Sequence, residues 1–138
     1  MKPFNIFIAV FLVVIAIGFL FFRDGFNKPS PVLMDRLNYI DYSSSNLESA
    51  KRNGKTVLFF AATIWCQTCQ ALEKEIKERG NILPSDVTIL KVDYDHDREM
   101  NRKWGVTSQH TLIVLDQNGN EVKRWIGGNL DALMQNLN

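Results

Sequence analysis

The only two cysteines of the chain, Cys66 and Cys69, lie in the sequence Trp65-Cys66-Gln67-Thr68-Cys69. They follow an apolar run and open a segment with helical periodicity, so we expect them at the start of a helix. Free amides and partial positive charge at a helix start favour a thiolate over a thiol. A thiolate attacks a disulfide, and a second thiol one turn away resolves the mixed disulfide. This spacing predicts a thiol–disulfide exchanger with Cys66 as nucleophile and Cys69 as resolving cysteine.

The cysteine pair has other interpretations. A structural disulfide that closes so short a loop would contribute only about 2 kcal/mol, and two buried thiols could be inert. A zinc site needs two further ligands, and the chain has only His96 and His110. These histidines have thirteen residues between them, which does not fit the spacing of a zinc finger. From the residues alone, redox exchange and the inert alternatives stay open.

Strands and helices alternate around this pair. The expected elements are a weak strand at 38–42, a helix from a capping box at Ser45 to Gly54, a buried strand at 56–61, a helix at 66–79 stopped by Gly80, a buried strand at 87–92, a helix at 98–104, strands at 111–115 and 121–126 joined by an Asn118-Gly119 turn, and a helix at 129–137. The order predicts an α/β domain, a central sheet with helices on both faces.

The N-terminal segment differs in composition from the rest. Residues 4–22 are nineteen positions without an ionisable side chain, about the length that spans a hydrocarbon core. We therefore predict an N-terminal membrane anchor at 1–22, a signal-anchor transmembrane helix at about 4–22. A linker rich in Gly, Pro and Ser at 23–36 would follow, and then the globular domain at 37–138. The Lys and Arg count around the span does not decide on which side of the membrane the domain lies.

Composition excludes several classes of protein. The chain has 138 residues, of which 46% are hydrophobic, with 16 Lys and Arg against 15 Asp and Glu. The high apolar fraction excludes a disordered chain. Two cysteines exclude a disulfide-rich mini-protein. The balanced charge gives no support for nucleic-acid binding, which normally shows a clustered basic excess.

From about residue 38 to the end, the chain resembles the thioredoxin superfamily. The matching pieces, in order, are the strand TVLFFAA, the motif WCQTC that opens a helix, the strand TILKVDYD, the helix ending KWGV, the strand TLIVLD, the turn NGN, the strand VKRWIGG and a final helix. The resemblance implies a thioredoxin fold with a central mixed sheet, Cys66 as nucleophile and Cys69 as resolving cysteine. It implies a redox-active disulfide and no bound cofactor or metal.

The chain departs from the family pattern at three positions. His110 stands where the family normally has a cis-proline, and because a cis bond before a non-proline residue costs about 3–4 kcal/mol, we expect the Gln109–His110 peptide to be trans. Phe60 stands where thioredoxins bury an acid, so His110 is a candidate replacement that could tune the thiols. Lys74 stands where a proline often kinks the helix, which affects the shape of that helix more than its chemistry.

Several residues next to the cysteines are predicted to bind substrate or tune the sulfurs. They are Trp65, Gln67, Thr68, Gln109 and His110. Gln67 and Thr68 lie between the cysteines, where the family sets its redox potential. Their identities match neither the usual reductant nor the usual oxidant, so the direction of exchange does not follow from them.

These observations predict a membrane-anchored thiol–disulfide oxidoreductase, more a reductant than an oxidant. Its partners would be protein thiols and disulfides and an unidentified redox partner. By analogy with anchored bacterial reductases, we expect the domain to be periplasmic or otherwise extracytoplasmic. The main alternative is a metal-binding or metal-delivery module that uses Cys66, Cys69 and His110. A further alternative is a non-catalytic adaptor, which would keep its function in a Cys66→Ser variant.

Overall fold

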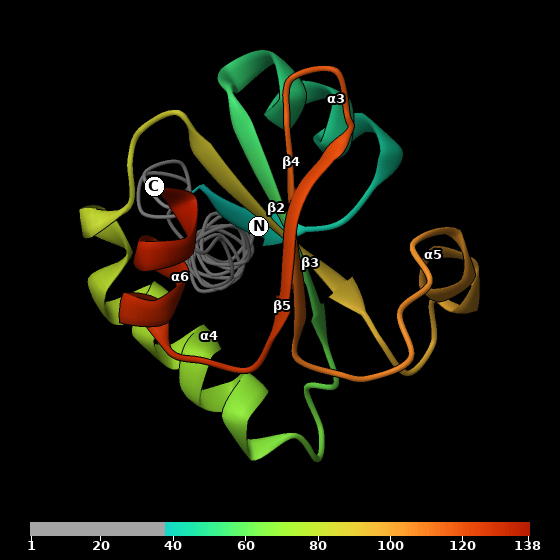
Figure 1. The fold of residues 1–138 in the computed structure, drawn as a ribbon. Helices are drawn as coiled ribbons and strands as arrows, with labels where there is room; N and C mark the ends of the chain where they lie inside the picture. The colour runs from blue at the N-terminus through green and yellow to red at the C-terminus, as the bar shows by residue number, and fades with distance from the viewer. Residues whose placement is uncertain (1–37) are drawn as a thin grey trace, which may run out of the picture. The chain divides into compact units, whose positions relative to one another are not determined.

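A five-stranded sheet organises residues 38–138, the part of the chain that this computed structural model describes (Figure 1). The elements are β1 (Tyr39–Asp41), α3 (Ser44–Asn53), β2 (Lys55–Ala61), α4 (Gln67–Arg79), the 3-10 turn η1 (Gly80–Ile82), β3 (Val87–Asp93), α5 (Arg98–Lys103), β4 (Thr111–Leu115), β5 (Glu121–Ile126) and α6 (Leu130–Leu137). The spatial order of the strands is β1-β3-β2-β4-β5. Strands β1, β3 and β2 are parallel, whereas β4 is antiparallel to β2 and β5 to β4. The mixed sheet that the resemblance implied is confirmed.

The two faces of the sheet are both covered. Figure 1 shows α4 and α6 on one side and α3 and α5 on the other. On the first side, β2 contributes Val57 and Phe59 to a buried cluster that also contains both cysteines. On the second side, β2 contributes Leu58 and Phe60 to a separate cluster. Alternate residues of one strand therefore build two cores, which explains why the run from 57 to 61 is apolar without interruption.

The expected element boundaries agree closely with the structure, with one correction at the start of α3. The sequence placed the capping box at Ser45, but the N-cap is Ser43, whose side chain accepts a hydrogen bond from the Asn46 amide. Glu48, the expected partner in the box, instead pairs with Lys51 at 3.1 Å. Consecutive serines are equally suited to capping by type, so only the path of the chain after β1 decides which one caps the helix.

Gly54, which ends α3 as expected, lies where no larger residue fits. Its φ is +150°, and a Cβ there would collide with the Asp86 carbonyl oxygen, which already accepts a 2.9 Å hydrogen bond from the Lys55 amide. We expect Gly54→Ala to lower the free energy of unfolding by about 3 kcal/mol or more, since strain and a clash add. Gly105→Ala is the matched control: its φ is +58° but its Cβ would meet open space, so only about 1–2 kcal/mol should be lost. Urea denaturation of both variants measures the difference, and equal losses would contradict the clash.

The predicted membrane anchor at 1–22 and linker at 23–36 lie outside the described residues. Within residues 38–138, no helix has both the length and the apolar character needed to cross a membrane. The anchor stays a prediction from the sequence.

Candidate active site at the start of helix α4

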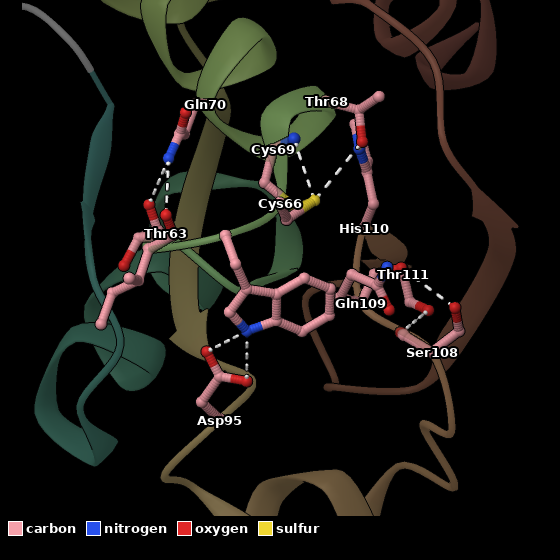
Figure 2. Close-up of a disulfide and its surroundings, with 12 residues drawn as sticks. Thr63, Cys66, Thr68, Cys69, Gln70, Asp95, Ser108, Gln109, His110 and Thr111 are labelled. Atoms are coloured by element: carbon pink, nitrogen blue, oxygen red, sulfur yellow. Dashed lines mark hydrogen bonds between the residues drawn. A yellow bond between two sulfur atoms is a disulfide. The ribbon is translucent and has the colours of Figure 1, made fainter.

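Cys66 and Cys69 form a disulfide where β2 leads into α4 (Figure 2). Cys66 is the N-cap of the helix, and its Sγ accepts a hydrogen bond from the Cys69 amide at 3.2 Å. Cys66 is 5% exposed and Cys69 is 1% exposed. The helix start therefore supplies an amide hydrogen to the first sulfur, and the second sulfur is the more deeply buried of the two.

The loop between β2 and α4 is fixed by side chains on each side of the cysteines. The Gln70 side-chain amide donates to the carbonyl oxygens of Thr63 and Ile64, at 2.8 and 3.2 Å. The Trp65 indole N–H donates to both carboxylate oxygens of Asp95, which follows β3, at 3.1 and 3.2 Å. Trp65 is nevertheless 55% exposed. The Asp95 contact was not predicted from the sequence.

His110 lies directly before β4 and is 3% exposed. Its backbone N–H donates to the Phe60 carbonyl and its own carbonyl accepts from Gly127, both at 2.8 Å. Its imidazole lies against the Phe59 ring, with ring centroids 5.4 Å apart. The described residues contain no cis peptide bond, so the expected trans Gln109–His110 peptide is confirmed.

The backbone of His110 has an unusual conformation. Its φ is +57°, which makes it the one non-glycine residue at 38–138 in the left-handed region. This region is sparsely populated by residues with a Cβ, although histidine enters it more often than most. The two backbone hydrogen bonds on either side hold the residue there and direct its ring toward the cysteines. No local pattern predicted this conformation.

A chain of close polar contacts joins His110 to Cys66. His110 Nδ1 lies 2.9 Å from Thr68 Oγ1, and the same Oγ1 lies 3.4 Å from Cys66 Sγ. Figure 2 draws Thr68 and His110 beside the Cys66 sulfur. Of the other predicted tuning residues, Gln67 is exposed and Gln109 is half-buried. The structure therefore brings His110 and Thr68 to the sulfurs, which their spacing in the sequence could not establish.

Three potential metal donors also meet at this place. One donor atom each from Cys66, Cys69 and His110 lies within 4.8 Å of the others. His110 Nε2 is buried and has no hydrogen-bond partner. With the two sulfurs joined in a disulfide, the pair offers no thiolate ligand, so this cluster could act on a metal only after reduction.

Burial makes His110 a source of pH-dependent stability. Burial lowers the pKa of His110, and its contact with the Gly128 backbone acts in the opposite direction. An unfolded histidine has a pKa of about 6.5, so below that pH the unfolded chain takes up the proton first. Stability is therefore complete above about pH 6.5 and declines as the pH falls toward the lower folded pKa. Urea unfolding between pH 8 and about pH 5 should show this decline.

In the variant His110→Asn, the free energy of unfolding should depend less on pH in this range. The substitution removes the titrating group and retains a residue that tolerates a positive φ. The exposed His96 supplies the control, since His96→Gln should leave the His110-dependent decline in place. Burial would raise the pKa values of Asp93 and Glu73, but hydrogen bonds from His96 to Asp93 and from Lys77 and Lys91 to Glu73 lower them. The contributions of these carboxyl groups therefore disappear only at more acidic pH. An unchanged profile in His110→Asn would contradict the assignment.

The chain is similar in sequence to known thioredoxins. The family model described as Thioredoxin matches residues 40–138. Thioredoxin H2-1 of Oryza sativa is 34% identical over 91 residues, which cover 66% of this chain and 64% of that protein. Thioredoxin of Chlamydia trachomatis is 34% identical over 85 residues, which cover 62% of this chain and 80% of that protein. The chain spans less than two thirds of the rice protein.

Solved structures match over the same region. Thioredoxin NaTrxh of Nicotiana alata superposes with a TM-score of 0.59 at 31% identity, covering 71% of this chain and 88% of that one. Trxlp of Edwardsiella tarda has a TM-score of 0.58 at 23% identity, covering 72% and 96%, and this second likeness concerns the fold alone.

Proposed function

This chain belongs to the thioredoxin family of thiol–disulfide oxidoreductases, and on that premise we propose that it reduces protein disulfides through Cys66 and Cys69 while anchored to a membrane. The observation that carries the proposal is the Cys66–Cys69 disulfide at the start of α4, where the Cys69 amide donates to the Cys66 sulfur. A sulfur at this place is stabilised as an anion after reduction, because the amide and the helix dipole both favour negative charge.

The exchange has two balanced steps. The Cys66 thiolate attacks one sulfur of a substrate disulfide, forms a mixed disulfide and releases the other substrate sulfur as a thiolate, which takes up a proton. Cys69 then loses its proton and attacks Cys66, so the intramolecular disulfide forms and the second substrate thiolate leaves. Two electrons pass from the protein pair to the substrate, and a separate dithiol donor must reduce the pair again.

The substrate would approach at the exposed side of the site. Trp65 and Ile64 are both exposed and apolar, and they directly precede the nucleophile. Such a surface suits an extended apolar stretch of a protein around its disulfide. Trp65 is held by Asp95, so this part of the surface is ordered before the substrate binds.

The redox proposal is tested by titrating the full-length chain against a series of dithiothreitol or glutathione buffers and counting alkylated thiols. One reversible two-electron transition is expected. A potential near about −270 mV would support a reductant, whereas one near about −120 mV would indicate an oxidant and overturn the direction. A Cys69→Ser chain is the control, because it cannot form the intramolecular disulfide.

Metal binding is the competing interpretation, since the donor atoms of Cys66, Cys69 and His110 lie within 4.8 Å. Metal analysis of the reduced full-length chain after incubation with Zn²⁺ or Cu⁺ distinguishes metal binding from thiol–disulfide exchange. Stoichiometric metal together with no reversible thiol transition would favour the metal module. A reversible transition without retained metal would support exchange.

The anchor and the extracytoplasmic position are proposed from the apolar residues 4–22 and from analogy with anchored bacterial reductases. Reporter fusions at the C-terminus, one active only in the cytoplasm and one active only outside it, measure the topology. Activity of the cytoplasmic reporter alone would overturn the extracytoplasmic position. Extraction of the chain from membranes by alkaline carbonate would overturn the anchor.

A further inference from the structure

We propose that the Thr68 hydroxyl is a positioning group for the nucleophile: held by His110, it donates its hydrogen to the Cys66 sulfur in the reduced protein and favours the thiolate. The inference rests on the proposed exchange activity, which requires a reduced Cys66. It assigns His110 an indirect role, through Thr68, rather than direct contact with the nucleophile.

The geometry places one hydroxyl between two groups. Thr68 Oγ1 lies 3.4 Å from Cys66 Sγ and 2.9 Å from His110 Nδ1. Thr68 lies in the first turn of α4, two residues after Cys66, so the helix itself fixes the hydroxyl beside the sulfur. Together with the Cys69 amide at 3.2 Å, the sulfur has two hydrogen-bond donors within reach.

The direction of these hydrogen bonds follows from the chemistry of the thiolate. An ionised sulfur accepts hydrogen bonds and has no hydrogen to donate, so Thr68 must donate its single hydroxyl hydrogen to Cys66. The lone pairs of Thr68 Oγ1 then face His110, whose Nδ1 must carry a hydrogen and donate it. In the neutral ring this leaves Nε2 without a hydrogen. Nε2 is buried and has no hydrogen-bond partner, so Thr68 Oγ1 is the side-chain partner that decides which ring nitrogen carries the hydrogen.

His110 supplies what Thr68 lacks by itself, which is a fixed orientation of the hydroxyl. Thr68 is exposed, so its hydroxyl could otherwise turn to bulk water. His110 is buried and is held by backbone hydrogen bonds to Phe60 and from Gly127. A rigid donor at Nδ1 directs the hydroxyl hydrogen away from itself and toward the sulfur.

Other ionisable groups do not replace this arrangement. Within residues 38–138, Cys69 on α4 and His110 before β4 each have a donor atom within 4.8 Å of Cys66 Sγ. The carboxylate of Asp95, after β3, accepts from the Trp65 indole. Substituting Thr68 should therefore change the ionisation of Cys66 without removing an ionisable group.

The test compares Thr68→Val, which keeps the shape and removes the hydroxyl, with Thr68→Ser, which keeps the hydroxyl. In the chemically reduced full-length chain, the ultraviolet absorbance of the thiolate gives the ionisation midpoint of Cys66. Thr68→Val should raise that midpoint by about one pH unit, a tenfold loss of thiolate at lower pH. At pH values below the midpoint, the rate of exchange with a small disulfide should fall only about threefold, because the thiolate of the variant is more basic and therefore more nucleophilic. Thr68→Ser should restore both values and is therefore the matched control.

A double variant tests the indirect role of His110. If His110 acts through Thr68, His110→Ala should raise the ionisation midpoint in the wild-type background and add nothing in Thr68→Val. The same shift in both backgrounds would mean direct action and overturn the inference. Should His110→Ala fail to fold, the ring nitrogens of the reduced wild-type protein are read by NMR. A protonated Nδ1 is expected, and an unprotonated Nδ1 in the neutral ring would overturn the inference.

Failure of this inference differs from failure of the proposed function. The ionisation titration uses chemically reduced protein and does not depend on turnover. A wild-type chain without a reversible Cys66–Cys69 transition would overturn the exchange proposal. A redox-active chain in which Thr68→Val matches the wild type in ionisation and in exchange rate would overturn the role of Thr68 alone.

Discussion

A Cys66→Ser variant is expected to lose disulfide reduction entirely, with the rate falling to that of the electron donor without the protein. A serine hydroxyl stays protonated at neutral pH and forms no disulfide, so neither step of the exchange can begin. Cys69→Ser should instead stop after the first step, because Cys66 can still attack and nothing resolves the product. Insulin reduction measures the first expectation, and non-reducing electrophoresis with mass spectrometry measures the second.

The two serine variants also separate the proposed roles of the sulfurs. Cys66 is the more exposed of the two and lies at the helix start, whereas Cys69 is buried one turn inside. Accumulation of mixed disulfides in Cys66→Ser, and not in Cys69→Ser, would reverse the assignment. Retained cellular function in Cys66→Ser would favour the non-catalytic adaptor.

The second large effect is expected at His110, where the residue normal for the family should destabilise this chain. Proline fixes φ near −65° and has no N–H, but His110 has a φ of +57° and donates to the Phe60 carbonyl at 2.8 Å. His110→Pro therefore removes a buried hydrogen bond between β2 and the start of β4 and requires a different local backbone. We expect the free energy of unfolding to fall by about 2 kcal/mol or more.

Urea denaturation of the oxidised chain measures this loss, with His110→Asn as the matched control. Asparagine keeps the N–H and tolerates the left-handed region, so its loss should be less than half that of His110→Pro. If the proline variant were as stable as the wild type, the loop before β4 would have adopted the backbone usual in the family. That result would contradict the destabilisation expected from losing the hydrogen bond to the Phe60 carbonyl and the left-handed backbone at His110.

The secondary-structure elements and their order could be predicted from the amino-acid sequence, because the signals for them are local. The mainly apolar run at 56–61 predicted a strand buried on both faces, and the Asn118-Gly119 pair predicted the hairpin between β4 and β5. The cysteine spacing placed both sulfurs on the first turn of one helix, where the structure has them. Each of these features depends on residues within one element or one turn.

The distant groups that contact the sulfurs, by contrast, depend on how the strands are arranged in the fold. Thr68 and His110 are 42 positions apart and meet only because β4 pairs with β2, whose end leads into the cysteine loop. Trp65 meets Asp95 across 30 positions for a related reason, since β3 lies beside β2. No local pattern encodes such contacts, because they depend on strand order and register. The left-handed backbone at His110, likewise held by bonds to two other segments, became visible only in the folded chain.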